Sequence, residues 1–126
     1  RELFGADRTT LLKWLFEGAP QYAFVMEGTQ GIQGYCLGRK GFNFTQIGPI
    51  VSEDTNTAQA LASAALNNCA GEPVILDVLH HNAEWLAWVT ETGFTEQRPF
   101  IRMFRGSNRF PGIPEKQFAI AGPEYG

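Results

Sequence analysis

The sequence contains few of the residues that several functional classes require. Its two cysteines, Cys36 and Cys69, match neither a C-x-x-C pair nor a zinc-ligand spacing, so we predict no metal site and expect two reduced thiols in a cytoplasmic protein. Lysine and arginine number 10 against 13 aspartates and glutamates, and a net charge of −3 lacks the basic surface that binds nucleic acid. No apolar run approaches the ~20 residues that cross a membrane. We therefore expect neither nucleic acid nor a membrane as a partner.

The chain does contain enough apolar side chains to fill one core. Hydrophobic residues make up 44% and aromatic residues 13% of the 126 residues, so we expect a single domain over residues 1–126. Asp7 can cap a first helix, which Gly18 and Pro20 end.

Three strands are predicted after this helix. Residues 21–27 and 32–38 are separated by a glycine-containing turn and predict a hairpin. A third strand over 43–51 contains Gly48-Pro49. Because proline has no N–H for the ladder, we expect a bulge at this point.

The next segment predicts two helices around a buried strand. A helical stripe of apolar residues covers 54–69, and the apolar run 74–78 predicts a strand. Asn82 is a preferred N-cap for the following helix. Gly93-Phe94 ends that helix, because glycine suits the left-handed position after a helix.

Two more strands are predicted near the end, at 98–105 and 116–121. The whole order predicts an α/β mixed sheet with helices on both faces. In it, the strands 43–51 and 74–78 should be parallel neighbours. Ligands of such sheets bind beyond the carboxyl ends of these strands.

Asp77 and His80 are candidate catalytic residues. Asp77 faces away from its apolar neighbours, so it is either a general base or half of a structural pair with Arg98 or Arg102. His80, next to His81, lies at the carboxyl end of the same strand, where a neutral imidazole can act as a base or simply be solvated.

The predicted strand 98–105 alternates arginine and phenylalanine on one face. Arg98 and Arg102 could hold a carboxylate or phosphate of a ligand. The other interpretation is an edge strand whose arginines pair with Asp77 or Glu96.

The strand, asparagine, helix and Gly-Phe pattern resembles the GNAT superfamily of acetyltransferases. The matching positions are Leu76, Val78, Asn82, Leu86, Gly93 and Phe94. More narrowly, IGPIVSED at 47–54, LDV at 76–78, GF at 93–94 and RMFRG at 102–106 resemble the diverged C-terminal domain of tandem-GNAT proteins. The resemblance implies a GNAT-like acyl-CoA N-acyltransferase fold that lacks its first strand. It also implies that the chain is the C-terminal part of a longer protein.

The resemblance also implies a place for acetyl-CoA. GNAT proteins bind this co-substrate where two parallel strands splay apart, here 43–51 and 73–78. The backbone of Ile50 and Val51 would then pair with pantetheine, and Thr57 would lie in the helix start that holds the pyrophosphate. Asn82 would contact the cofactor.

The chain differs from the family pattern at two chemical positions. Residues 54–59 contain no glycine where the family has a glycine-rich loop, and Glu53 and Asp54 put carboxylates where phosphates would lie. Val89 replaces the tyrosine that protonates the leaving thiolate.

Two functions follow from these matches and differences. The first is an N-acetyltransferase that moves acetyl from acetyl-CoA to an amine of a small molecule or peptide, with Asp77 or His80 as base. The alternative is a non-catalytic domain that docks on an upstream GNAT domain or binds a small anionic ligand. Tryptophan-rich helices and an incomplete sheet edge also suggest a homo-oligomer.

Overall fold

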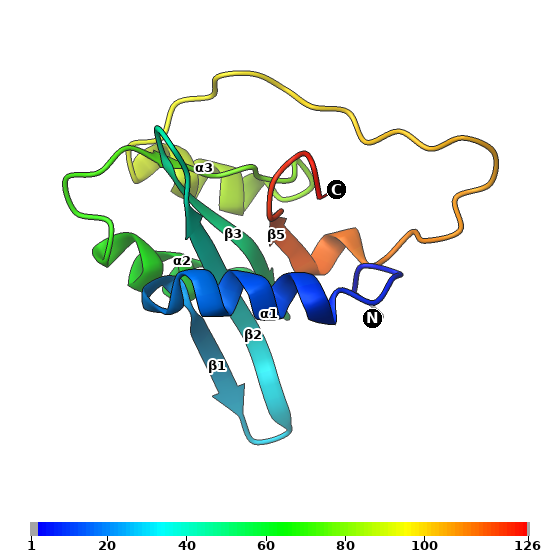
Figure 1. Ribbon diagram of the computed structural model, residues 1–126, viewed down its shortest axis with the longest axis horizontal. Coiled ribbons are helices and arrows are strands. Elements are labelled where there is room, and N and C mark those ends of the chain that lie inside the picture. Colours follow the sequence, from blue (N-terminus) through cyan, green and yellow to red (C-terminus); the bar gives the residue numbers. More distant parts are fainter. Residues whose placement is uncertain (1–2, 126) are drawn as a thin grey trace.

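The computed structural model describes residues 3–125 as a twisted sheet with helices on both faces (Figure 1). The helices are α1 (Thr9–Gly18), α2 (Thr55–Asn67) and α3 (Ala83–Glu91), with short 3-10 turns at Pro20–Tyr22 and Pro114–Lys116. The strands are β1 (Phe24–Gly28), β2 (Gly31–Lys40), β3 (Thr45–Ser52), β4 (Val74–Ile75) and β5 (Gln117–Ala119). Across residues 3–125, no helix is long and apolar enough to span a membrane.

The sheet is mixed, as the sequence predicts. Its order is β1-β2-β3-β4, and β5 also pairs with β3. β1, β2 and β3 are antiparallel neighbours, whereas β3 and β4 run parallel. The prediction of parallel neighbours on either side of α2 is therefore confirmed.

The bulge predicted at Gly48-Pro49 is present in β3. Cys36 pairs with Ile50 and Gly38 with Ile47, so Gly48 and Pro49 together face a single residue of β2. Gly48 has a φ of +154°, and a Cβ atom there would lie 2.1 Å from the carbonyl oxygen of Ile120. Glycine is needed because the chain after β5 runs directly over this position.

Helices cover both faces of the sheet. Leu15 of α1 packs with Leu37 of β2 on one face. On the other face α2 and α3 close the main core. Its largest members without exposed surface include Trp85, Ile47 and Ile50. The α2 stripe consists of alanine and leucine, which lets this helix lie close to the strands.

The helix boundaries follow local capping. Asp54 accepts a hydrogen bond from the Thr57 N–H and begins α2. Asn82 does the same for α3 through the N–H of Trp85, as predicted. Gly93 ends α3 with a φ of +110°. The N-cap predicted for α1 needs correction, because Arg8 and not Asp7 holds that position. Asp7 instead accepts from the N–H and the hydroxyl of Thr9, the first residue of α1.

Two strand predictions need correction. The segment 98–105 is not a strand: its residues are exposed and have no ladder partner. The alternation is present, but no sheet edge lies alongside it. The strand predicted over 74–78 is shorter, because β4 covers only Val74–Ile75 and an isolated bridge follows at Val78.

Candidate functional site

The candidate site is the gap where β3 and β4 separate. The two strands pair at Thr45 with Val74 and at Gln46 with Ile75, and then diverge. β5 lies in the opening. On one side it pairs with Ile50 and Val51 of β3, the two residues whose backbone would pair with pantetheine according to the family resemblance.

The other side of β5 is also bonded. Ala119 forms a bridge with Val78, the Ile120 N–H donates to the Asp77 carbonyl at 2.9 Å, and the Leu79 N–H donates to the Phe118 carbonyl at 3.4 Å. The gap between the parallel strands is therefore filled by the chain itself. The backbone of Ile50 and Val51 is not a free edge in this structure.

Side chains from α3 and the preceding loop hold β5 in place. The Trp85 indole N–H donates to the Phe118 carbonyl at 3.0 Å, and the two rings meet edge to face at 5.3 Å. The Nε2 atom of His81 lies 2.7 Å from the Gln117 carbonyl oxygen. Because β5 has only three residues, these side-chain contacts add to its few backbone hydrogen bonds.

The start of α2 is occupied by a carboxylate of the chain. Asp54 Oδ1 accepts from the Thr57 N–H at 2.7 Å, and Asp54 Oδ2 accepts from the Thr57 hydroxyl at 3.1 Å. Thr57, assigned to the pyrophosphate by resemblance, therefore directs both of these donors to Asp54. Glu53 beside it forms an ion pair with Lys116 at 2.7 Å. A phosphate would meet two carboxylates at this place.

Asn82 connects the starts of two helices. Its Oδ1 accepts from the Trp85 N–H at 3.0 Å, and its Nδ2 donates to the Thr55 hydroxyl of α2 at 2.8 Å. Both ends of the amide are therefore engaged within the protein. The capping role is confirmed, and contact with a cofactor stays a prediction.

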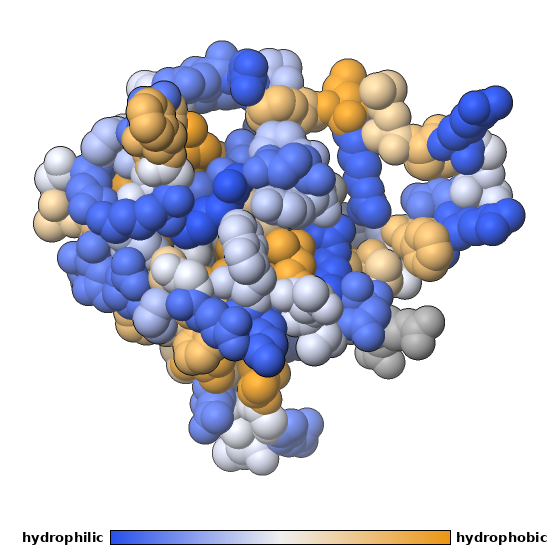
Figure 2. All heavy atoms as spheres, in the orientation of Figure 1, coloured by the Kyte–Doolittle hydropathy of each residue, from blue (hydrophilic) through white to orange (hydrophobic). Residues whose placement is uncertain are grey.

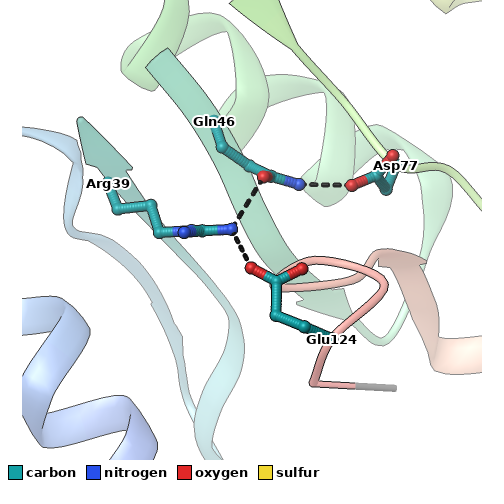
Figure 3. A network of polar contacts seen from close by, with 4 residues as sticks. All are labelled: Arg39, Gln46, Asp77 and Glu124. Carbon is teal, nitrogen blue, oxygen red and sulfur yellow. Dashed lines mark hydrogen bonds and ion pairs between the residues drawn. The ribbon is translucent and has the colours of Figure 1, made fainter. Parts of the chain in front are cut away.

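Asp77 belongs to a polar network on the α1 face of the sheet (Figure 3). The Gln46 amide donates to Asp77 and accepts from Arg39 Nη2 at 3.1 Å, and Arg39 also pairs with Glu124. Asp77 faces away from its apolar neighbours, as the alternation predicts. Its partner is Gln46, so the expected pairing with Arg98 or Arg102 is wrong.

The remaining predicted residues lie apart from this network. His80 is exposed in the loop before α3. Val89 is buried in the core against α2 and the sheet. Arg98 stacks on Phe100 at 5.0 Å, and Arg102 donates to the Phe110 carbonyl at 3.2 Å. Within residues 3–125, neither arginine forms an ion pair with Asp77 or Glu96.

The cysteines and acids do not form a reactive or metal-binding cluster. Cys36 and Cys69 are both free and buried. Burial raises the pKa of the Cys36 thiol to about 12, and the nearby Cys69 adds to this rise. Cys36 is therefore protonated at neutral pH and is no nucleophile. Within the described part of the chain, no group of His, Cys, Asp and Glu could hold a metal ion.

These observations test whether acetyl-CoA fits in the position that the fold family implies. β5 lies where pantetheine would pair, Asp54 holds the donors at the helix start, and Val89 offers no proton. The residues present do not fit the group in this arrangement. No chemical step is therefore assigned to acetyl-CoA within this gap.

The sequence did not identify β5, Arg39, Gln46 or Glu124 as parts of the site. One available signal was Trp85, since a buried indole N–H needs an acceptor and the helix holding it offers none. Another was Gly48 beside proline, which marks close approach by another backbone. Neither signal names the segment that approaches.

The comparisons with known proteins agree with this architecture. Residues 1–119 match the family described as acetyltransferase (GNAT) domain. The holothin acyltransferase of Pseudoalteromonas sp. (strain SANK 73390) is 29% identical over 126 residues, which is 99% of this chain and 42% of that protein. The chain thus spans less than half of that relative's length. No solved structure matches this chain.

Both comparisons indicate acyl transfer as the general chemistry of the relatives. The mixed sheet, the splayed parallel strands and the helices on both faces are the architecture expected for that family. The chain belongs to the GNAT acetyltransferase domain family.

Proposed function

We propose that this domain serves an N-acetyltransferase as its non-catalytic GNAT unit. It docks on a second GNAT domain, in the same polypeptide or in another one, and that domain binds acetyl-CoA. The reaction moves the acetyl group to an amine of a small molecule or peptide. The GNAT family and the acyltransferase relative support the general chemistry, and acetyl-CoA is the general co-substrate of GNAT domains.

One observation carries the proposal that this unit is non-catalytic. β5 pairs with β3 at Ile50 and bridges to Val78, so it fills the gap between the parallel strands from edge to edge. A pantetheine chain and β5 would need the same hydrogen-bonding groups of β3. Displacing β5 would expose the buried side chain of Phe118 and leave the Trp85 N–H without its acceptor.

The second candidate is catalysis by this domain after β5 moves aside. The short length of β5 favours it, since only three residues would have to leave. Asp77, next to the gap, would then be the base, with His80 as the other choice. Asn82, Ile50, Val51 and Thr57 would bind the cofactor.

Calorimetric titration of this domain by itself, residues 1–126, with acetyl-CoA separates the two candidates. Free CoA and ADP serve as ligand controls, and release of free thiol from acetyl-CoA is followed with a panel of amines. The proposal predicts no binding and no amine-dependent release. Micromolar binding that depends on Asn82 would overturn it in favour of the second candidate.

Two variants of Asn82 make this outcome interpretable. Asn82→Ala removes the helix cap as well as the amide, so it weakens folding by about 1 kcal/mol. Asn82→Ser keeps a side-chain oxygen that can cap through the Trp85 N–H, adds no charge and removes the amide that contacts Thr55. Loss of acetyl-CoA binding in folded Asn82→Ser would identify the amide as a cofactor contact.

A further inference from the structure

The segment 98–110 forms an exposed arch that is fixed to the domain on both sides. All of its residues are exposed. On one side Phe94 packs on the main core after α3, and on the other the Ile113 N–H donates to the Leu3 carbonyl at 2.8 Å. Figure 2 shows open space beneath the arch and hydrophilic side chains gathered at its outer end. The two anchors limit how far this outer end can move.

The outer part of the arch, residues 102–110, closes on itself as a loop. The Arg102 guanidinium donates through Nη2 to the Phe110 carbonyl at 3.2 Å, and this bond joins the two ends of the loop. The Phe110 N–H donates to the side-chain oxygen of Asn108 at 3.3 Å. A Cβ atom at Gly5 would lie 2.8 Å from the Phe110 backbone, so the base of the loop also rests on the N-terminal segment.

A cavity of about 410 Å³ opens within this loop. Three arginines and two phenylalanines line it, together with the small and polar residues 106–108 between them: Arg102, Arg105, Arg109, Phe104 and Phe110. No acidic residue is part of the lining. The cavity therefore combines positive charge with apolar surface.

The positive charge of this segment has no counterpart nearby. The segment 98–110 contains four arginines and no acid, in a chain whose net charge is −3. Within residues 3–125, none of the recorded ion pairs involves one of these arginines. Burial and the charge of Arg102 lower the pKa of Arg8, so a further guanidinium lies close to the loop. An anion in the cavity would reduce the repulsion among these groups.

We infer that the loop 102–110 binds the phosphate group of a phosphate monoester whose remaining part is a flat apolar ring. Each guanidinium offers a planar pair of N–H donors that fits two oxygens of an anion. A carboxylate has one charge and two oxygens, which one such pair satisfies. A phosphate monoester carries close to two charges and three strong acceptor oxygens, so it suits three arginines around one cavity. The phenylalanines then contact the ring of the ligand.

The structure changes which arginines act together. The alternation in 98–105 predicts Arg98 and Arg102 as a pair that holds an anion. In the structure Arg98 stacks on Phe100 at 5.0 Å, and neither of these two residues lines the cavity. The chain turns at Gly106, which has a φ of +79°, instead of continuing as a strand. This turn brings later arginines to the cavity in place of Arg98.

Titration of the isotope-labelled chain with phenyl phosphate, followed by nitrogen–proton NMR, tests this inference. We expect saturable shifts confined to the amide and guanidinium signals of residues 102–110 and their neighbours, with a Kd in the millimolar range or below. Inorganic phosphate lacks the ring and benzoate carries a single charge, so both should bind more weakly. Sodium chloride at equal ionic strength is the control for general charge effects.

Matched substitutions separate the cavity from the rest of the segment. Arg105→Gln and Arg109→Gln should each weaken the binding of phenyl phosphate about fivefold, as loss of an exposed charged contact does. Arg98→Gln removes the same charge outside the cavity and should weaken binding less than about twofold. Phe104→Ala should reduce the preference for phenyl phosphate over inorganic phosphate, whereas Phe100→Ala should leave this preference unchanged.

Two outcomes would overturn the inference: no saturable shift with phenyl phosphate, or equal losses of binding in Arg98→Gln and Arg105→Gln. Phosphate monoesters occur on soluble molecules and on lipid headgroups, and cosedimentation with vesicles of phosphatidic acid in phosphatidylcholine separates these two sources. Cosedimentation that is lost when Arg105 and Arg109 are both replaced by glutamine would identify a lipid headgroup. Binding of phenyl phosphate without cosedimentation would identify a soluble ester.

This site does not depend on the proposed function, because the loop lies outside the gap between β3 and β4. Acetyl-CoA and ADP also carry phosphate groups, so the acetyl-CoA titration is repeated with the variant that lacks both Arg105 and Arg109. Binding that persists in this variant and is lost in Asn82→Ser belongs to the gap. Binding that is lost only with the arginines belongs to the loop, so the two inferences can fail independently.

Discussion

β5 and the exposed segment 98–110, here called the arm, are neighbouring segments of the chain with opposite outcomes. The arm has clear strand alternation and ample length, yet it forms no ladder. β5 has three residues, and it is buried with hydrogen-bonded neighbours on both sides. The difference shows that an open edge, more than a pattern, decides whether a segment becomes a strand.

The edges explain this difference in physical terms. The diverging β3 and β4 leave two rows of backbone groups that must be satisfied, and β5 is the segment that reaches them. Once β5 is in place, no unpaired row remains in that gap for the arm. The arm is left with apolar side chains but no backbone partner.

The largest expected effect on stability comes from replacing Trp85, which has no exposed surface and donates a hydrogen bond to β5. Trp85→Ala should lower the free energy of unfolding by roughly 3–5 kcal/mol, because it removes a large core side chain and the N–H donor. Trp85→Phe keeps a ring and should cost less, about 1–2 kcal/mol for the lost hydrogen bond and partial void. Urea unfolding followed by circular dichroism measures both. A Trp85→Phe variant as stable as wild type would show that the indole N–H does not hold β5.

The next effect concerns the approach of β5 to the bulge. Gly48→Ala places a Cβ atom 2.1 Å from the Ile120 carbonyl oxygen, so β5 must shift away. We expect a loss of roughly 1–3 kcal/mol, with faster amide exchange in β5 than elsewhere in the sheet. Gly71→Ala is the matched control, since Gly71 also has positive φ but has open space around it. Similar exchange of β5 amides in the two variants would contradict the close approach.

A smaller, pH-dependent effect is expected at the β2-β3 connection. Hydrogen bonds from Lys40 and Thr45 hold the pKa of Glu72 below its usual range. Because the folded-state pKa is lowered, the stabilisation is present above the unfolded-state pKa and is lost as the pH falls through the folded-state value. Glu72→Gln should therefore have a lower free energy of unfolding than wild type at neutral pH, and this difference should disappear in acid. A difference that stays constant over the acid range would contradict the assigned hydrogen bonds.

The smallest effect is predicted for the arm. Met103→Ser changes a side chain that is 84% exposed and should alter the free energy of unfolding of the monomer by less than about 0.5 kcal/mol. Urea unfolding followed by circular dichroism measures the change. A substantial loss of monomer stability would show that the arm packs on its own domain, which would remove the contrast with β5.

Local features of this fold were predictable, because the residues that cause them are neighbours in sequence. Asn82 caps the helix that starts one residue later, and Gly48-Pro49 interrupts its own strand. The outward direction of Asp77 follows from the alternation of its neighbours. The order of the predicted elements already indicated the parallel pair around α2, which is the frame of the site.

Features that depend on distant partners were not predictable. Asp77 bonds to Gln46 on another strand, and nothing near Asp77 distinguishes that amide from the arginines of the arm. The sequence predicts a strand over both 98–105 and 116–121, although only the second segment reaches an open edge of the sheet. Filling of the gap depends on where two strands diverge, which is a property of the assembled sheet.

The position of β5 also bears on the order in which the domain is made. β5 follows every other described strand in the chain, and Gln117 bonds to the Leu3 carbonyl across 114 residues. During synthesis, α1 to α3 and the first four strands leave the ribosome while the gap between β3 and β4 is still open. Its exposed backbone groups and core side chains then need protection, so a nascent chain stopped before residue 117 should be the species that chaperones bind most.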